Sequence, residues 1–177
     1  MTCIVGLVKD NKVYIGGDSA GVTGYNIQIR GDTKVFRHGP FIMGFTTSFR
    51  MGQLLHYDFN VPEHPEDMDD MKYMVSVFIP AVRSCFKDGG FQKTKDNQDE
   101  GGVFLVGYKG KLYEIDSDYQ VGQMVDNVTA VGCGANVAIG AMYASEHLTP
   151  RERIKKSLEI TTYLNAGVRP PFVIEEL

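Results

Sequence analysis

Short apolar runs near the start of the chain predict strands that are covered on both faces. Residues 4–8 and 13–17 are apolar at consecutive positions rather than at alternating ones, which is typical of strands buried between two layers. Asp10 and Asn11 separate these runs and tolerate the positive φ of a tight hairpin turn. By similar patterns, further strands are predicted at 33–37, 41–45, 103–106, 111–115, 128–131 and 172–177.

Apolar residues repeat with helical spacing in the remaining segments. A helix predicted over 47–59 is followed by the loop VPEHPED and by a helix over about 67–86, which Pro80 is expected to kink. Small residues over 135–146 predict a third helix. A fourth begins at Thr149-Pro150-Arg151-Glu152, which combines a capping threonine, a proline at the first position and a glutamate three residues after the cap.

The order of these elements predicts the fold class. Strands, two helices, strands, two helices and a last strand indicate an α+β fold in which two antiparallel sheets pack face to face between outer helix pairs, a four-layer αββα sandwich. The chain has 177 residues and shows no internal repeat or linker, so we expect a single domain over residues 1–177. The polar, glycine-flanked segment 88–102 predicts a mobile loop.

Composition narrows the classes of function. The net charge of −4 argues against a nucleic-acid-binding protein, which would carry a basic face. Three cysteines without zinc-ligand or C-x-x-C spacing indicate reduced thiols. The four histidines form no H-x-x-x-H pattern, so neither a metal nor another cofactor is expected. The longest apolar runs are too short to cross a bilayer, and no signal peptide is recognisable, so the sequence predicts a cytoplasmic protein without a membrane partner.

The first hairpin brings an aspartate back towards the start of the chain. If Lys9 pairs with Lys12 across the turn, the numbers of facing residues sum to 21. Thr2 then lies opposite Ser19, with Asp18 one step away. The pattern therefore predicts that Thr2 and Asp18 lie close together.

Thr2 has unusual chemistry if Met1 is removed, which aminopeptidases do before small residues. The freed α-amine has a pKa near 7.7–8.0 and is partly neutral at cytoplasmic pH. It can then take the proton of the hydroxyl on the same residue, so that one residue supplies both nucleophile and base. A nearby cation would lower the pKa of the amine further, and Lys34, held by Asp18, is the candidate.

The stretch TCIVGLVKDNKVYIGGDSAG resembles the N-terminus of proteasome β-type subunits, and especially of bacterial HslV, which are N-terminal-nucleophile (Ntn) hydrolases. Asp18 and Lys34 match the aspartate and lysine of that family at the same distance from the threonine. Met43-Gly44-Phe45 matches the A-G-F turn, Gly132-Cys133-Gly134 matches the G-S-G turn, and the ending FVIEEL resembles the last strand of HslV.

The resemblance implies a threonine endopeptidase with the Ntn hydrolase fold. Thr2 would attack a peptide carbonyl, Lys34 and Asp18 would activate it, the Gly44 N–H would stabilise the oxyanion, and Cys133 would flank the amine. Substrate would bind as an extended strand along Gly21 and Val22, opposite Thr46. The implied partners are a peptide or unfolded protein, copies of the same chain in a homo-oligomeric ring, and an ATP-driven unfoldase.

The chain also departs from the family pattern. Cys133 replaces the serine of G-S-G, and a thiol is a weaker hydrogen-bond donor. The region around Asn165 has no carboxylate where the proteasome has an aspartate, although HslV lacks that carboxylate too. Thr46-Thr47-Ser48 replaces a more glycine-rich stretch.

Other functions remain open from the sequence. The chain is alternatively a ring-forming scaffold that has lost catalysis, or an Ntn amidase acting on a small molecule. A thiol nucleophile at Cys3 or Cys133 lacks an obvious histidine partner. The stretch AVGCGANVAIGA imitates a dinucleotide-binding fingerprint, but its last glycine is misplaced and no acid follows at the required distance.

Overall fold

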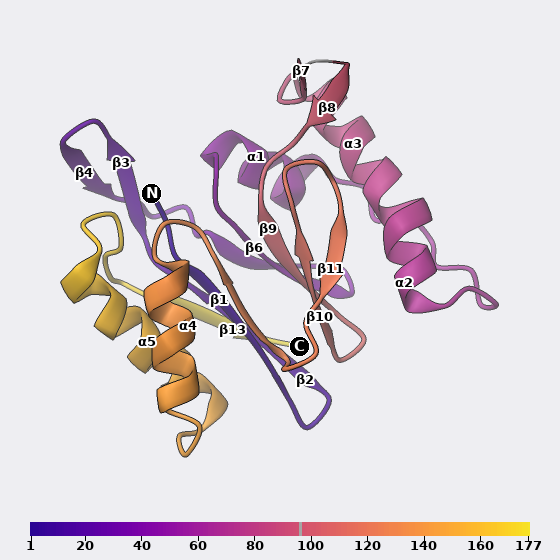
Figure 1. The fold of residues 1–177 in the computed structure, drawn as a ribbon. Coiled ribbons are helices and arrows are strands. Elements are labelled where there is room, and N and C mark those ends of the chain that lie inside the picture. The colour runs from indigo at the N-terminus through magenta and orange to yellow at the C-terminus, as the bar shows by residue number, and fades with distance from the viewer. Residues whose placement is uncertain (96) are drawn as a thin grey trace.

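Two antiparallel sheets form the centre of the molecule (Figure 1). The computed structural model describes residues 1–95 and 97–177. The first sheet has the strand order β12-β1-β2-β13 and the second the order β11-β10-β9-β6-β5. The strands of the first sheet are β1 (Ile4–Lys9), β2 (Lys12–Gly17), β12 (Val128–Val131) and β13 (Val173–Glu176). Those of the second are β5 (Val35–His38), β6 (Phe41–Phe45), β9 (Phe104–Tyr108), β10 (Lys111–Ile115) and β11 (Val121–Gln123).

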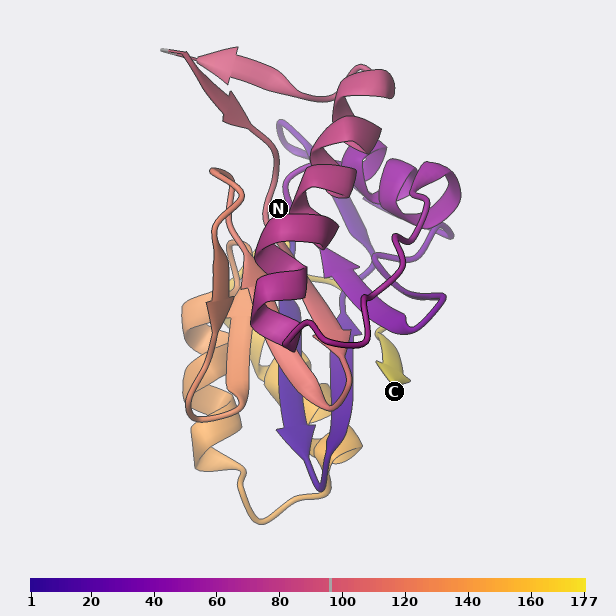
Figure 2. The ribbon, with the colours of Figure 1, turned by 90° about the vertical axis from the view of Figure 1, so that its right-hand side faces the viewer.

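Helices cover the outer face of each sheet, as Figures 1 and 2 show. The pair α4 (Ala135–Ala144) and α5 (Pro150–Leu164) packs on the first sheet, where both helices contact β1. On the second sheet lie α1 (Phe49–Gln53), the π-helical turn Leu54–Asp58, α2 (Asp70–Tyr73), the π-helical turn Met74–Phe78 and α3 (Ile79–Asp88). The predicted four-layer αββα sandwich is therefore confirmed.

The continuous apolar runs reflect strands that are buried on both faces. In β1, Val5 and Leu7 pack against α4 and α5, whereas Ile4 faces the second sheet. In β6, Met43 packs under the helices of the second sheet and Ile42 packs between the sheets. Each such side chain stabilises the fold by about 1.5–3 kcal/mol relative to its exposed state. This packing holds the start of β1 in place, and the residues before it with it.

The helices differ from the prediction in their internal geometry. The helix expected over 47–59 and the one expected over 67–86 each contain a π-helical turn. The second of these turns directly precedes Pro80, which lies in the first turn of α3. A proline ring conflicts with the carbonyl four residues earlier in a regular α-helix, and the wider turn removes that conflict. The kink expected at Pro80 thus corresponds to a local change of helix type.

Two short hairpins were not predicted. β3 (Ala20–Thr23) and β4 (Asn26–Ile29) form a separate two-stranded sheet that directly follows Asp18. The segment 88–102, expected as a loop, contains β7 (Lys93–Lys95) and β8 (Gln98–Glu100), which pair with each other. The first hairpin matters for function because it forms one wall beside Thr2, as described below. None of the described helices is long and apolar enough to span a membrane.

Candidate functional site

The β1–β2 hairpin has the predicted register. Lys9 faces Lys12 and Ile4 faces Gly17, so the numbers of facing residues sum to 21 as expected. Beyond the last ladder pair, the Asp18 N–H donates to the Cys3 carbonyl over 3.3 Å. Two apolar strands and a tight turn therefore bring the Asp18 side chain beside the segment that carries Thr2.

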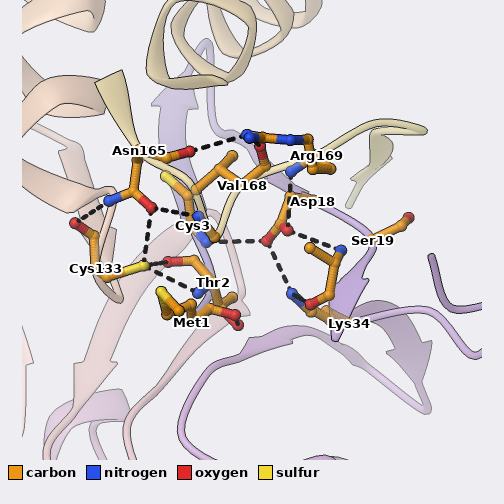
Figure 3. A network of polar contacts seen from close by, with 12 residues as sticks. Met1, Thr2, Cys3, Asp18, Ser19, Lys34, Cys133, Asn165, Val168 and Arg169 are labelled. Atoms are coloured by element: carbon orange, nitrogen blue, oxygen red, sulfur yellow. Dashed lines mark hydrogen bonds and ion pairs between the residues drawn. The ribbon is translucent and has the colours of Figure 1, made fainter. Parts of the chain in front are cut away.

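Asp18 connects the start of β1 to Lys34 (Figure 3). Its Oδ1 accepts the Cys3 N–H at 3.0 Å and the Lys34 Nζ at 2.9 Å. Its Oδ2 accepts the N–H of Ala20 at 2.9 Å and that of Arg169 at 3.4 Å. The carboxylate is 1% exposed, and these donors replace the water that burial removes. One oxygen thus joins the peptide that follows Thr2 to a buried ammonium.

Lys34 is a buried cation with its donors directed inwards. Its Nζ also donates to the Ala20 carbonyl over 2.7 Å. Burial lowers the pKa of Lys34, whereas the Asp18 charge and hydrogen bond act to raise it. Together Asp18 and Ala20 hold the ammonium next to the cavity that Thr2 borders, where it is weakly hydrated and its field is little screened.

Thr2 carries Met1 in this structure, so its nitrogen is an amide and not a free amine. That amide N–H donates to Cys133 Sγ over 3.2 Å, and Thr2 Oγ1 donates to the Met1 carbonyl over 2.6 Å. Met1 lies against Gly167, where a β-carbon would come within 2.1 Å of Met1 Cβ. The side chain of Met1 is 57% exposed, whereas Thr2 is 5% exposed.

The turn 132–134 holds a thiol beside the Thr2 nitrogen. Gly132 has a φ of 96°, and a β-carbon there would lie 2.3 Å from the Thr2 carbonyl oxygen, so only glycine fits this close approach. The Cys133 thiol can donate to the Thr2 carbonyl at 3.4 Å or to Asn165 Oδ1 at 3.3 Å. Asn165 Nδ2 donates to the Cys133 carbonyl over 2.8 Å, which fixes the turn against the end of α5.

A cavity of about 130 Å³ opens beside Thr2. The three predicted substrate-binding residues line it: Gly21 and Val22 from β3, and Thr46 from the segment after β6. Lys34 lines it as well. The structure therefore brings together the predicted nucleophile Thr2, the Lys34 cation and the two predicted walls of a peptide cleft.

The backbone N–H of Gly44 is not free for the role of oxyanion donor that the resemblance implied. It lies inside β6, opposite Val35 on one side and Leu105 on the other. The Thr46 N–H donates to the Val103 carbonyl on the β9 side, and the alternation of an antiparallel ladder directs the Gly44 N–H to that same side. A β-carbon on Gly44 would clash with Ile4 at 2.6 Å. The glycine is thus required for packing between the sheets, and its N–H is used by the sheet.

The backbone N–H of Thr47 is better placed than that of Gly44 as a candidate hydrogen-bond donor to the cavity. Its φ is 64°, which is uncommon for a β-branched residue and marks local backbone strain. Its neighbours use their N–H groups within the chain, Thr46 towards Val103 and Ser48 towards Thr46. For the Thr47 N–H, no acceptor exists among the residues that the structure describes, and Thr47 borders the cavity with Thr2.

Sequence reasoning missed Thr47 and Asn165 as site residues. No local signal distinguishes Thr47, because threonine rarely adopts a left-handed backbone conformation. Asn165 had a usable signal, since it lies in the region where the proteasome has an aspartate. Among the described residues, no group of three or more histidine, cysteine, aspartate or glutamate side chains could hold a metal ion.

Comparison with known proteins rests on structure alone. No protein-family model matches the chain, and neither does any curated protein. Among solved structures, BPH of Thiobacillus denitrificans superposes with a TM-score of 0.83 at 17% identity, covering 99% of this chain and 97% of the other. A structure of BPH in complex with epoxomicin gives a TM-score of 0.82 at 16% identity, covering 99% and 98%.

Two further structures agree. Eukaryotic HslV from Trypanosoma brucei has a TM-score of 0.69 at 16% identity, with 99% of both chains covered. This chain has the Ntn hydrolase fold. Anbu, described as an ancestral β-subunit, from Yersinia bercovieri has a TM-score of 0.67 at 14% identity, covering 99% of this chain and 81% of that one. At such identities the likeness establishes the Ntn hydrolase fold, and the roles of individual residues are argued from geometry.

The two cysteines of the site should differ sharply in reactivity. Burial raises the pKa of Cys3 to about 12, whereas Cys133 is exposed. Since only the thiolate attacks an alkylating agent, iodoacetamide at pH 8 should modify Cys133 and leave Cys3 unmodified in the folded protein. Peptide mass mapping after brief labelling measures this directly. Modification of Cys3 before Cys133 would contradict the placement of Cys3 in the core.

Proposed function

We propose that the chain is a threonine-type peptidase that uses Thr2 as its N-terminal nucleophile after removal of Met1. The observation that carries this proposal is the position of Asp18. Its Oδ1 binds both the peptide N–H that follows Thr2 and the Lys34 ammonium. A buried carboxylate that fixes a cation beside a hydroxyl-bearing N-terminal residue is suited to activating that residue as a nucleophile.

The reaction follows from these groups. The Thr2 amine, freed from Met1, takes the hydroxyl proton directly or through one water while Oγ1 attacks the peptide carbonyl carbon. Lys34 stabilises the alkoxide that develops on Oγ1. The Thr47 N–H would donate to the oxyanion of the tetrahedral intermediate. The protonated amine then gives its proton to the leaving nitrogen, and the C–N bond breaks to leave an ester on Thr2.

Water completes the cycle. The free amine of Thr2 accepts a proton from a water molecule that attacks the ester, and Oγ1 leaves with that proton. Cys133 Sγ, which is 3.2 Å from the Thr2 nitrogen, would accept an amine N–H and so direct the nitrogen lone pair away from itself. A sulfur acceptor forms a weak hydrogen bond, so this contact orients the amine with little change to its basicity.

Substrate and assembly are part of the same proposal. An extended peptide would lie between β3 and the segment after β6, pairing with the backbone near Gly21 and Thr46. By analogy with the HslV and Anbu structures, copies of the chain would assemble into a ring, with unfolded protein as substrate and an ATP-driven unfoldase as a further partner. A cytoplasmic location would fit this role.

A catalytically inactive scaffold of the same fold is the second candidate, because catalysis by Thr2 depends on the removal of Met1. Met1 lies against Gly167 and is joined by its peptide bond to the Thr2 nitrogen, which is therefore not basic. A chain that retained Met1 in this position would lack the base, while the fold and any assembly surfaces would be unchanged. The state of the N-terminus therefore separates the two functions.

Intact mass and covalent labelling test this choice. The purified protein should lack the mass of one methionine, and a peptide epoxyketone should add one inhibitor mass at Thr2. Thr2→Ala should lose Met1 as well, because alanine is also small, but should take up no inhibitor. A mature protein that has lost Met1 and still takes up no inhibitor would overturn the peptidase and favour the scaffold.

A further inference from the structure

Arg30 lies across the cleft beside Thr2 and touches both of its walls. Its aliphatic stem lies over Gly21, where a β-carbon would come within 3.1 Å of Arg30 Cγ. Its guanidinium carbon lies 4.2 Å from the ring centroid of Phe49, at the start of α1. A side chain at Gly21 would therefore require the Arg30 stem to shift by a few tenths of an ångström.

Among the residues that the structure describes, the cavity is lined by several hydrogen-bond donors and by no carboxylate. Its charged lining residues are the cations Arg30 and Lys34, and the aspartates that pair with them, Asp18 and Asp32, are not part of the lining. The other polar side chains that line it are neutral: Thr2, Thr23, Gln28, Thr46, Thr47 and Ser48. A side chain that enters this space thus meets two cations and no anion.

Arg30 is the more accessible of the two cations that line the cavity. The Lys34 ammonium is buried and donates to Asp18 and to the Ala20 carbonyl. Arg30 uses only Nε and Nη2, each 2.6 Å from an oxygen of Asp32. Its Nη1 has no acceptor among the described residues. The Arg30 side chain is 35% exposed, so an incoming ligand can reach it.

We propose that this cleft selects acidic peptides, with Arg30 binding a carboxylate side chain on the substrate residue that supplies the scissile carbonyl. The proposal rests on the proposed peptidase function and names its substrate class. A planar guanidinium stacked on Phe49 is held ready for a charge-assisted hydrogen bond. Lysine or arginine at the same substrate position would face like charge without a partner.

Asp32 should moderate this preference. It holds the guanidinium in place through two hydrogen bonds but also competes with the substrate carboxylate for the same cation. Removing the Asp32 charge should therefore strengthen selection for acidic residues, whereas removing the Arg30 charge should abolish it. These opposite effects distinguish recognition by Arg30 from a general loss of structure.

Four fluorogenic peptides that differ only in the residue before the scissile bond test the proposal: glutamate, glutamine, leucine and lysine. We expect kcat/KM for glutamate to exceed that for glutamine by about tenfold, the value of one charge-assisted hydrogen bond, and lysine to be the poorest. Arg30→Gln should bring the glutamate-to-glutamine ratio close to one. Asp32→Asn should raise the ratio above the wild-type value.

Arg37→Gln is the matched control. Arg37 is an exposed arginine on β5 that pairs with Glu175 at 3.8 Å and does not line the cavity. Its removal changes the net charge as Arg30→Gln does and should leave the ratio unchanged. Arg30→Lys keeps the charge without the planar fork, so it should retain part of the preference even where Arg30→Gln folds poorly.

The possible results distinguish a failure of the proposed acidic specificity from a failure of the proposed peptidase function. Hydrolysis with leucine or lysine preferred over glutamate, or a glutamate preference that persists in folded Arg30→Gln, would overturn the acidic specificity and leave the peptidase intact. If none of the four peptides is cleaved by a protein whose Thr2 is free, both proposals fall. A ratio lowered by Arg30→Gln and raised by Asp32→Asn would establish the assignment.

Discussion

Thr2→Ala is expected to lower kcat/KM for peptide hydrolysis by at least about 10³-fold, the scale seen when a covalent nucleophile is removed. Alanine keeps the α-amine, since Met1 is removed before alanine as before threonine. The Lys34–Asp18 pair also remains, because Asp18 contacts the backbone of this segment through the Cys3 N–H. The variant therefore lacks only the hydroxyl and the methyl group, and its loss of activity reports on Oγ1.

Thr2→Ser is the matched control for this measurement. Serine retains the hydroxyl and the amine, so it should keep activity within about tenfold of the wild type. Initial rates with one fluorogenic peptide, measured on samples whose N-termini have been checked by mass, give both comparisons. Equal activity of Thr2→Ala and the wild type would show that another group attacks the substrate, and Cys133 would then be the first to test.

The part of the site that depends on the first hairpin could be predicted from sequence. Two apolar runs separated by Asp10 and Asn11 predict a tight turn with Lys9 opposite Lys12, and the looser turn that the sequence also allows would likewise return Asp18 to the start of the chain. Lys34 could be named as the candidate cation from its predicted strand, but its pairing with Asp18 was supported by the resemblance alone, because the turns between them contain no pattern that fixes the path of the chain.

The residue that could donate to an oxyanion could not be predicted from sequence. It depends on the side of the strand to which each backbone N–H of β6 points and on the strained backbone of Thr47. Met43-Gly44-Phe45 matches the family motif, but Gly44 lies at a position in β6 whose N–H is directed to the neighbouring strand β9. The residue with a free N–H, Thr47, adopts a φ of 64°. No propensity scale would assign that conformation to threonine, since it is imposed by the hydrogen bonds of its neighbours.

The β3–β4 hairpin was missed for a different physical reason. Tyr25, Ile27 and Ile29 alternate with polar residues as in a strand, but their side chains are exposed in the structure, so the hairpin forms without the buried face that such a pattern normally indicates. Arg30 follows this hairpin and reaches the cleft only because β4 pairs back on β3. The side chain that we propose for substrate selection is therefore placed by a hairpin that the sequence analysis did not predict.

Lys34→Met should cost about 3–5 kcal/mol of unfolding free energy, the loss expected when one partner of a buried ion pair is removed. The side chains of Lys34 and Asp18 are 1% and 0% exposed, so water cannot replace the missing partner. Methionine has a similar volume, which limits the loss of packing. Chemical denaturation measures the change, and hydrolysis should fall as well because Oγ1 loses its neighbouring cation.

A double-mutant cycle separates charge from packing in that loss. Asp18→Asn alone keeps an oxygen that can accept from the Lys34 ammonium but removes the negative charge beside it, so it should destabilise the protein too. The double variant contains no buried charge at this place and should be more stable than the sum of the single losses predicts, by about 1–3 kcal/mol. Strict additivity would mean that the two charges do not stabilise each other, and the activated nucleophile proposed for Thr2 would lose its basis.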